Sequence, residues 1–137
     1  MLGATDLLGR WQIRRQIDDR FAKQRGVYHG TAVFRDGAAG QLCYVEGGKI
    51  RFGVGPVLRA TREYRWHFLP DKVAVLFDDG RLLHHFVPAE QCDSSAHLCG
   101  SDLYKAIYDF RHWPLWEAVW QVSGPRKNYT LTSHFSK

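Results

Sequence analysis

The clearest alternation of apolar and polar positions lies near the end of the chain. Every second residue from Trp116 to Val122 is apolar, which is the period of a β-strand with one buried face. Gly124-Pro125 then interrupts the run, because proline cannot donate to a ladder and glycine accepts positive φ. A second alternation covers Tyr129 to Phe135. Residues 115–135 are therefore predicted to form an antiparallel hairpin.

Alternating runs of the same kind fill most of the chain before this hairpin. Gly47-Gly48 and Asp79-Gly80 are predicted as two-residue hairpin turns, since these residues accept positive φ. Residues 88–100 show no periodicity and are expected to be irregular. The other strands are predicted at residues 7–17, 27–34, 42–46, 49–52, 57–68, 72–77, 81–87 and 102–110.

These nine or ten short strands, joined by tight turns, predict an all-β fold, and the choice lies between a sandwich and an up-and-down barrel. Residues 11–21 lack proline and glycine and could instead form a helix, but the β-like run that follows favours a strand. The last strand must pair or leave an exposed edge, and its natural partner is the first strand. We therefore expect a single antiparallel β-barrel domain over residues 1–137.

Composition indicates the cellular compartment in which this barrel would occur. No stretch approaches the roughly 18 apolar residues that span a bilayer, and the first residues do not resemble a secretion signal. Cys43, Cys92 and Cys99 are an odd, small set, which favours free thiols in the cytoplasm. A Cys92–Cys99 bridge is the alternative that spacing allows.

The formal net charge is +5, from 19 basic and 14 acidic residues. A positive balance can indicate a polyanionic partner. Here the basic residues are scattered among acidic ones, which favours a solvated basic surface over nucleic-acid binding.

Gly9-Arg10-Trp11 on the first predicted strand resembles the G-x-W signature of the calycins, which include the lipocalins and fatty-acid-binding proteins. In those barrels a basic side chain of the last strand packs across this tryptophan. The resemblance implies that Arg126 or Lys127 packs on Trp11 and closes one barrel end through a cation–π contact.

A wider set of segments resembles a family of uncharacterised, lipocalin-like proteins over nearly the whole chain. The resemblance implies a barrel and no particular activity. The segments that carry it are residues 44–48, 62–66, 79–81, 97–104 and 124–129.

Polar side chains share faces with the large aromatic residues. A buried polar group without a partner costs roughly 1–3 kcal/mol, so these groups must pair with one another, with water or with a ligand. One interpretation is a self-satisfied network, for example Arg62 with Asp102; the other is a pocket that grips an anionic head and stacks a flat body. The predicted ligand-binding residues are Arg62, Tyr64, Trp66, His84, Asp102, Tyr104, Tyr108, Trp116 and Trp120.

Three functions follow from such a barrel. We expect a binding protein for a small anionic or aromatic molecule. The alternatives are an enzyme that uses His84 or Asp102 for proton transfer with Arg62 as anion clamp, and a solidly packed interaction module. No catalytic set can be assigned, the cofactor is unknown, and a homodimer is compatible with the many aromatic residues.

Metal binding is the remaining possibility. His97, Cys99 and Asp102 supply at most three donors, whereas a structural zinc site takes four. Adjacent His84 and His85 face opposite sides of a strand, so only one of them can point inward, as a base or a haem ligand. Neither group leads us to predict a metal site.

Overall fold

The computed structural model describes residues 2–94 and 96–137. Nearly all of this chain is strand, with one short helix before the first strand. The elements are α1 Ala4–Leu7, β1 Gly9–Asp19, β2 Gln24–Asp36, β3 Gln41–Phe52, β4 Val57–Phe68, β5 Val73–Phe77, β6 Leu82–Phe86, β7 Gln91–Asp93, β8 His97–Cys99, β9 Asp102–His112, β10 Leu115–Gly124 and β11 Lys127–Ser136.

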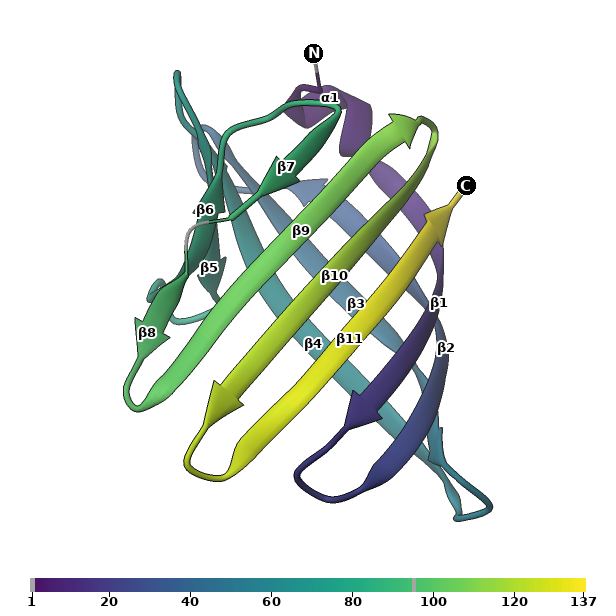
Figure 1. Cartoon of the computed structure of the whole chain (residues 1–137). Helices are drawn as coiled ribbons and strands as arrows, with labels where there is room; N and C mark the ends of the chain where they lie inside the picture. The colour runs from purple at the N-terminus through teal and green to yellow at the C-terminus, as the bar shows by residue number, and fades with distance from the viewer. Residues whose placement is uncertain (1, 95) are drawn as a thin grey trace.

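All eleven strands belong to one antiparallel sheet that curls into a nearly closed up-and-down barrel. Its order is β6-β5-β4-β3-β2-β1-β11-β10-β9-β7, with β8 paired beside β9. The first and last long strands lie side by side, with Ile13 opposite Phe135 and Ile17 opposite Leu131 (Figure 1). The predicted fold class, and the pairing of the two ends of the chain, are confirmed.

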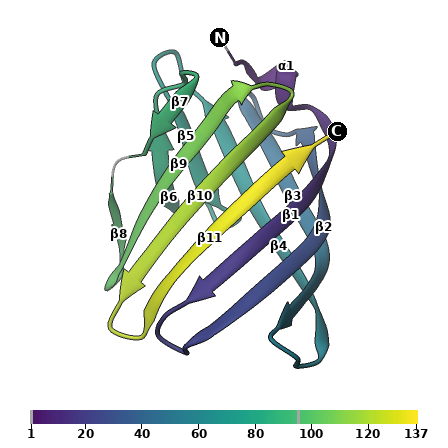
Figure 2. The same ribbon diagram turned by 45° about the vertical axis from the view of Figure 1, so that its right-hand side comes forward.

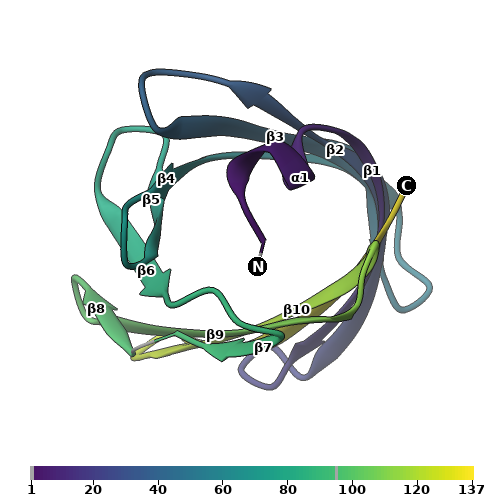
Figure 3. The ribbon, with the colours of Figure 1, turned by 90° about the horizontal axis from the view of Figure 1, so that it is seen from above.

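Strand pairing leaves one seam open, between β6 and the edge formed by β7, β8 and β9. No ladder joins β6 to β9 in the described chain, and the seam is visible from above in Figure 3. Side chains close it instead: His84 of β6 and Tyr108 of β9 share a hydrogen bond of 2.7 Å, and the rings of Phe86 and Tyr108 lie 4.5 Å apart. The barrel is therefore closed by packing where it is not closed by backbone hydrogen bonds.

Burial alternates along the long strands, as the sequence pattern requires. The inward positions of β1 run from Trp11 to Ile17 at every second residue. Edge-to-face aromatic contacts fill the upper interior, with Trp66 against both Phe34 and Tyr108. One face of each strand therefore forms a core that is largely aromatic.

The helix α1 lies across the upper opening of the barrel (Figure 3). Its Leu7 is fully buried, and the carbonyl of Leu7 accepts a hydrogen bond of 2.8 Å from the indole N–H of Trp11. The cation over the Trp11 ring is the Nζ of Lys137, 4.3 Å from the ring centroid.

The prediction that Arg126 or Lys127 packs on Trp11 is wrong. The β1–β11 register places Trp11 beside the end of β11, whereas Arg126 and Lys127 stand at its beginning, near Asp19. Because antiparallel pairing puts these positions at opposite ends of the barrel, neither side chain can reach Trp11.

Two local predictions are also corrected. Gly47-Gly48 is not a turn; both glycines lie inside β3, and the chain reverses at Gly53, where φ is +54°. Residues 88–100 contain the short strands β7 and β8. The helical alternative for residues 11–21 is excluded, since β1 occupies most of them.

None of the helices in residues 2–94 and 96–137 is long and apolar enough to cross a membrane.

Candidate functional site

A cavity lies in the barrel interior, below the aromatic packing at the upper end. Its free volume is about 20 Å³, which is room for about one water molecule. The interior is therefore not completely filled. The cavity is nevertheless too small to hold a ligand unless side chains move. The lining residues are Arg15, Tyr44, Glu46, Arg62, Tyr64, Trp66, Tyr108, Trp116, Ala118, Trp120, Leu131, Ser133 and Phe135.

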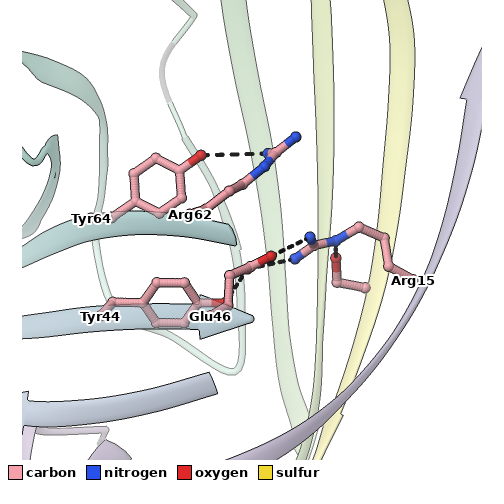
Figure 4. A network of polar contacts seen from close by, with 6 residues as sticks. Arg15, Tyr44, Glu46, Arg62 and Tyr64 are labelled. Carbon is pink, nitrogen blue, oxygen red and sulfur yellow. Dashed lines mark hydrogen bonds and ion pairs between the residues drawn. The ribbon is translucent and has the colours of Figure 1, made fainter. Parts of the chain in front are cut away.

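A buried ion pair forms one side of this cavity (Figure 4). The guanidinium of Arg15 on β1 donates to both carboxylate oxygens of Glu46 on β3, Nη1 to Oε2 at 2.6 Å and Nη2 to Oε1 at 2.9 Å. The Nε of Arg15 donates to Ser133 Oγ on β11 at 2.6 Å. The hydroxyl of Tyr44 donates to Glu46 Oε1 at 2.5 Å. Each guanidinium nitrogen of Arg15 and both carboxylate oxygens of Glu46 thus have a hydrogen-bond partner.

The pair keeps both groups ionised despite their burial. Burial works against the charge of Glu46, but the hydrogen bonds and charge of Arg15 outweigh it and lower the pKa of Glu46. Burial likewise opposes the charge of Arg15, and the contact with Glu46 raises the pKa of Arg15. Burial and the nearby carboxylate hold the pKa of Tyr44 well above its usual value, so its phenol stays a donor.

Arg62 on β4 lies directly opposite Glu46 of the neighbouring strand β3 and feels its charge, but it forms no ion pair with that carboxylate, which Arg15 already engages. It is half-buried, and its Nη1 contacts the hydroxyl of Tyr64 at 3.4 Å, a long hydrogen bond (Figure 4). None of the ion pairs among the described residues includes Arg62. With Arg15 and Glu46 neutralising each other, Arg62 gives the lining one uncompensated positive charge.

The aromatic walls differ in how much of each ring remains available. Trp116 is stacked on Phe135 with ring centroids 3.8 Å apart, and Trp66 is enclosed by other rings. Trp120 is only half-buried, and its ring lies edge-on to Tyr64 at 5.4 Å. Tyr64 is also half-buried, and desolvation raises the pKa of its phenol. Trp120 and Tyr64 therefore form the part of the wall that a ligand could reach.

Two buried polar atoms have no hydrogen-bond partner among the described residues, the hydroxyl of Tyr28 and the indole N–H of Trp116. The Trp116 ring is part of the cavity wall. Tyr28 lies under the guanidinium of Arg15, with Cζ 4.9 Å from its ring centroid. Both atoms retain hydrogen-bonding capacity inside the barrel.

His84 does not line the cavity. Its ring is buried, bonded to Tyr108 and edge-on to Trp120 at 5.2 Å. Burial, with smaller contributions from His85 and His97, lowers the pKa of His84 to about 3. The imidazole is therefore neutral at physiological pH, and its hydrogen bond to Tyr108 helps to close the seam between β6 and β9.

Asp102 and Tyr104 lie lower on β9, outside the residues that line the cavity. Asp102 pairs with Lys127 at 3.0 Å, and the Arg62–Asp102 network that the sequence suggested is not formed. The structure thus brings six predicted site residues to the cavity and leaves three beside it. The six are Arg62, Tyr64, Trp66, Tyr108, Trp116 and Trp120.

Sequence reasoning missed the ionic half of the site. Arg15 stands on the same face as Trp11 and Ile17, and a charged residue in an apolar row was the available signal. Glu46 shares a face with Tyr44 in the same way. Arg15 and Glu46 are 31 positions apart in the sequence. Alternation shows which face each residue lies on, but not that these two residues pair.

His97, Cys99 and Asp102, which the sequence analysis considered as metal donors, lie on the β8–β9 hairpin. His97 pairs with Tyr104, and Cys99 pairs with Asp102, as ordinary positions of the β8–β9 ladder. Across residues 2–94 and 96–137 no three His, Cys, Asp or Glu side chains form a cluster able to hold a metal ion. Cys43, Cys92 and Cys99 are free thiols, so the alternative Cys92–Cys99 bridge is not formed.

Comparison with known proteins identifies one matching family model. A family model described as "Family of unknown function (DUF6314)" matches residues 7–137. No curated protein matches the chain.

Solved structures show the same barrel at low sequence identity. A protein of unknown function from the DUF3598 family of Nostoc punctiforme aligns with TM-score 0.64 and 15% identity over 98% of this chain. The chain spans 48% of that protein, about half its length. The S-type phycobiliprotein lyase CPES from Guillardia theta aligns with TM-score 0.64 and 8% identity, covering 98% of this chain and 89% of the lyase. The redesigned β-barrel mFAP1, bound to DFHBI, aligns with TM-score 0.50 and 16% identity, covering 98% and 97%.

Proposed function

The chain belongs to the DUF6314 family of unknown function, and we propose that it binds a small, flat, anionic organic molecule inside its barrel. The observation that carries the proposal is Arg62, a half-buried guanidinium in an aromatic cavity wall. It forms no ion pair in the described chain, because Arg15 already engages the carboxylate of Glu46 opposite it. Desolvating such a charge is costly unless an anion compensates it, so the site favours an anionic ligand.

The arrangement of the wall suggests how the molecule would lie. Arg62 and the hydroxyl of Tyr64 would hold a carboxylate or phenolate through charge-assisted hydrogen bonds. The half-buried ring of Trp120 would cover the flat body. Since the cavity has room for about one water, binding requires Arg62, Tyr64 and Trp120 to move outward.

Two structural neighbours are a phycobiliprotein lyase and a redesigned barrel bound to DFHBI, and the second is a barrel of this shape that holds a ligand. At these identities the likeness carries the fold, so the chemistry of the ligand rests on Arg62 and its surroundings. We also propose distant kinship with the calycins, because a basic residue near the end of the chain, Lys137, covers the ring of Trp11.

The enzyme alternative receives less support from the geometry. His84 is bonded to Tyr108 at the seam, and Asp102 is paired with Lys127, so neither residue stands with Arg62 around the cavity. The packed-module alternative fits the small volume, but it does not explain why two guanidinium groups, of Arg15 and Arg62, share one carboxylate in the cavity lining.

The test is a titration of intrinsic tryptophan fluorescence with benzoate, salicylate and indole-3-carboxylate, with benzamide as the neutral match. We expect saturable quenching by the carboxylates and weaker binding of benzamide. Replacing Arg62→Met should weaken carboxylate binding by about 10- to 100-fold, the value of a hydrogen bond to a charged group.

Arg65→Met is the matched control, since Arg65 lies on the same strand and is exposed on the outer face. Its affinity should equal that of the unmodified protein. Equal affinity of the Arg62→Met variant, or no saturable signal with any carboxylate, would contradict the proposal.

A further inference from the structure

The outer wall made by β1 to β4 has a strong excess of positive charge. The outward positions of these strands carry eight Lys or Arg residues against two acids, Asp18 and Glu63. The basic set, scattered in the sequence, is Arg10, Arg14, Arg25, Arg35, Lys49, Arg51, Arg59 and Arg65.

Strand register aligns part of this set into one row across the wall. Arg14 on β1 is opposite His29 on β2, His29 is opposite Lys49 on β3, and Lys49 is opposite Arg59 on β4. Like charges directly opposite each other destabilise a sheet. Arg14, Lys49 and Arg59 form no ion pair with any described residue. The directly opposed charges of Lys49 and Arg59 are therefore not balanced by an ion pair, and the row is complementary to an anionic surface.

The β3–β4 hairpin adds exposed apolar side chains beside the row. Its turn lies at the lower end of the barrel, as the β1–β2 turn does (Figures 1 and 2). At its tip Val54 is 93% exposed, and on its returning strand Val57 and Leu58 are 56% and 54% exposed. Val57 is directly opposite Arg51, one outward row from the Lys49–Arg59 pair. The exposed apolar residues and the basic residues Lys49, Arg51 and Arg59 thus belong to the same hairpin.

We propose that this hairpin docks the barrel onto the surface of an anionic lipid bilayer. Val54, Val57 and Leu58 enter the headgroup region, where exposed apolar area is removed from water. Lys49 and Arg59 meet the negative surface potential of the lipid, and each basic residue near such a surface strengthens binding about five-fold. A few exposed apolar side chains next to basic residues are suited to the surface of an anionic lipid bilayer.

A nucleic acid is the competing polyanion, and the surface fits it less well. Single strands are held by stacking of bases on aromatic side chains as well as by basic residues. None of the outward positions of β1 to β4 carries Phe, Tyr or Trp; the apolar residues there are valines such as Val27 and Val45. Aliphatic side chains among cations favour lipid over bases.

The experiment is cosedimentation of the full chain with phosphatidylcholine vesicles that contain or lack roughly 30% phosphatidylserine. We expect binding only to the anionic vesicles, and release at high salt because the charges are solvent-exposed. The double variant Lys49→Gln/Arg59→Gln should bind about 25-fold more weakly, and Val54→Asp should also lose binding. Thermal unfolding by circular dichroism verifies that each variant is folded.

The matched control is Arg35→Gln/Arg65→Gln, which removes the same charge from the same wall three outward rows away from Lys49. We expect this variant to bind nearly as well as the unmodified chain. Equal loss in both double variants would overturn the assigned hairpin. Absence of binding to anionic vesicles would overturn the proposal, and tight binding of a fluorescent 20-nucleotide strand instead would identify nucleic acid as the partner.

Discussion

Arg15 and Glu46 face each other inside the barrel with two parallel contacts, Nη1 to Oε2 at 2.6 Å and Nη2 to Oε1 at 2.9 Å. Their strands, β1 and β3, are not neighbours, because β2 lies between them. The pair therefore reaches over β2 along the inner face of the sheet, and Arg15 lies over the ring of Tyr28 on that strand. Their residues are 7% and 2% exposed, so each charge depends on the other for its solvation.

Replacing Glu46→Gln should destabilise the fold by about 3–5 kcal/mol, because it leaves the buried guanidinium of Arg15 without its counter-charge. Urea unfolding at neutral pH measures the effect. The control is Glu63→Gln on the exposed face of β4, which should change the free energy of unfolding by less than about 0.5 kcal/mol. Similar stabilities of the two variants would show that the pair carries no stabilising charge.

The buried His84 predicts a specific acid sensitivity. Its pKa is about 3 in the fold against 6.5 in the unfolded chain, so between these values the unfolded chain binds more protons. The free energy of unfolding should therefore fall as the pH falls from 6.5 toward 3, with a contribution of roughly 1.4 kcal/mol per pH unit from this residue. In the variant His84→Phe, urea unfolding at several pH values should show a slope smaller by that amount.

Tyr108→Phe separates the hydrogen bond from the titration. It removes the partner of His84 and should cost about 1–3 kcal/mol at every pH, while the buried imidazole retains the acid slope. If the His84→Phe variant kept the slope of the unmodified protein, His84 would not be the titrating group.

The upper end of the barrel gives a direct test of the corrected cation–π contact. Lys137→Ala should lower the free energy of unfolding by about 0.5–1 kcal/mol, since it removes the ammonium over the Trp11 ring. Arg126→Ala, the residue that the calycin resemblance suggested, should leave stability unchanged because Arg126 is exposed at the other end. Thermal unfolding of both variants decides between the two residues; the reverse ranking would contradict the structure.

The fold could be predicted because one face of each long strand is buried. The alternation from Trp116 to Val122, and from Tyr129 to Phe135, carried both strand identity and facing, and β10 and β11 have that arrangement. Closure by the two ends of the chain followed from the need to cover an edge. The short strands β7 and β8 could not be seen, because three residues are too few to show a period.

The candidate site was only half predictable. Arg62, Tyr64 and Trp120 were found because alternation places them on one face with other large aromatics. The Arg15–Glu46 pair was missed because its partners lie on next-but-one strands, and no local pattern encodes which residues of β1 and β3 meet over β2. The position of Lys137 on Trp11 likewise depends on the register between the first and last strands.

Gly47 and Gly48 were interpreted as a turn, since adjacent glycines commonly supply positive φ, yet neither has it here. Their use is space. A Cβ on Gly48 would collide with the carbonyl oxygen of His29 and lie 2.8 Å from the ring of Tyr28, whereas a Cβ on Gly47 would meet only Thr61, at 3.8 Å. Gly48 thus lets the β2 and β3 backbones approach over the Tyr28 ring.

Two neighbouring alanine variants test this assignment. Gly48→Ala should destabilise the fold by about 1–3 kcal/mol, because backbone atoms that cannot move aside occupy the new methyl position. Gly47→Ala should be neutral or slightly stabilising, since its methyl group has room and the unfolded chain loses freedom. Urea unfolding of the two variants gives the comparison. If both were equally harmful, the glycines would be required for backbone conformation; if neither were, the close contact of β2 with β3 would not constrain the barrel.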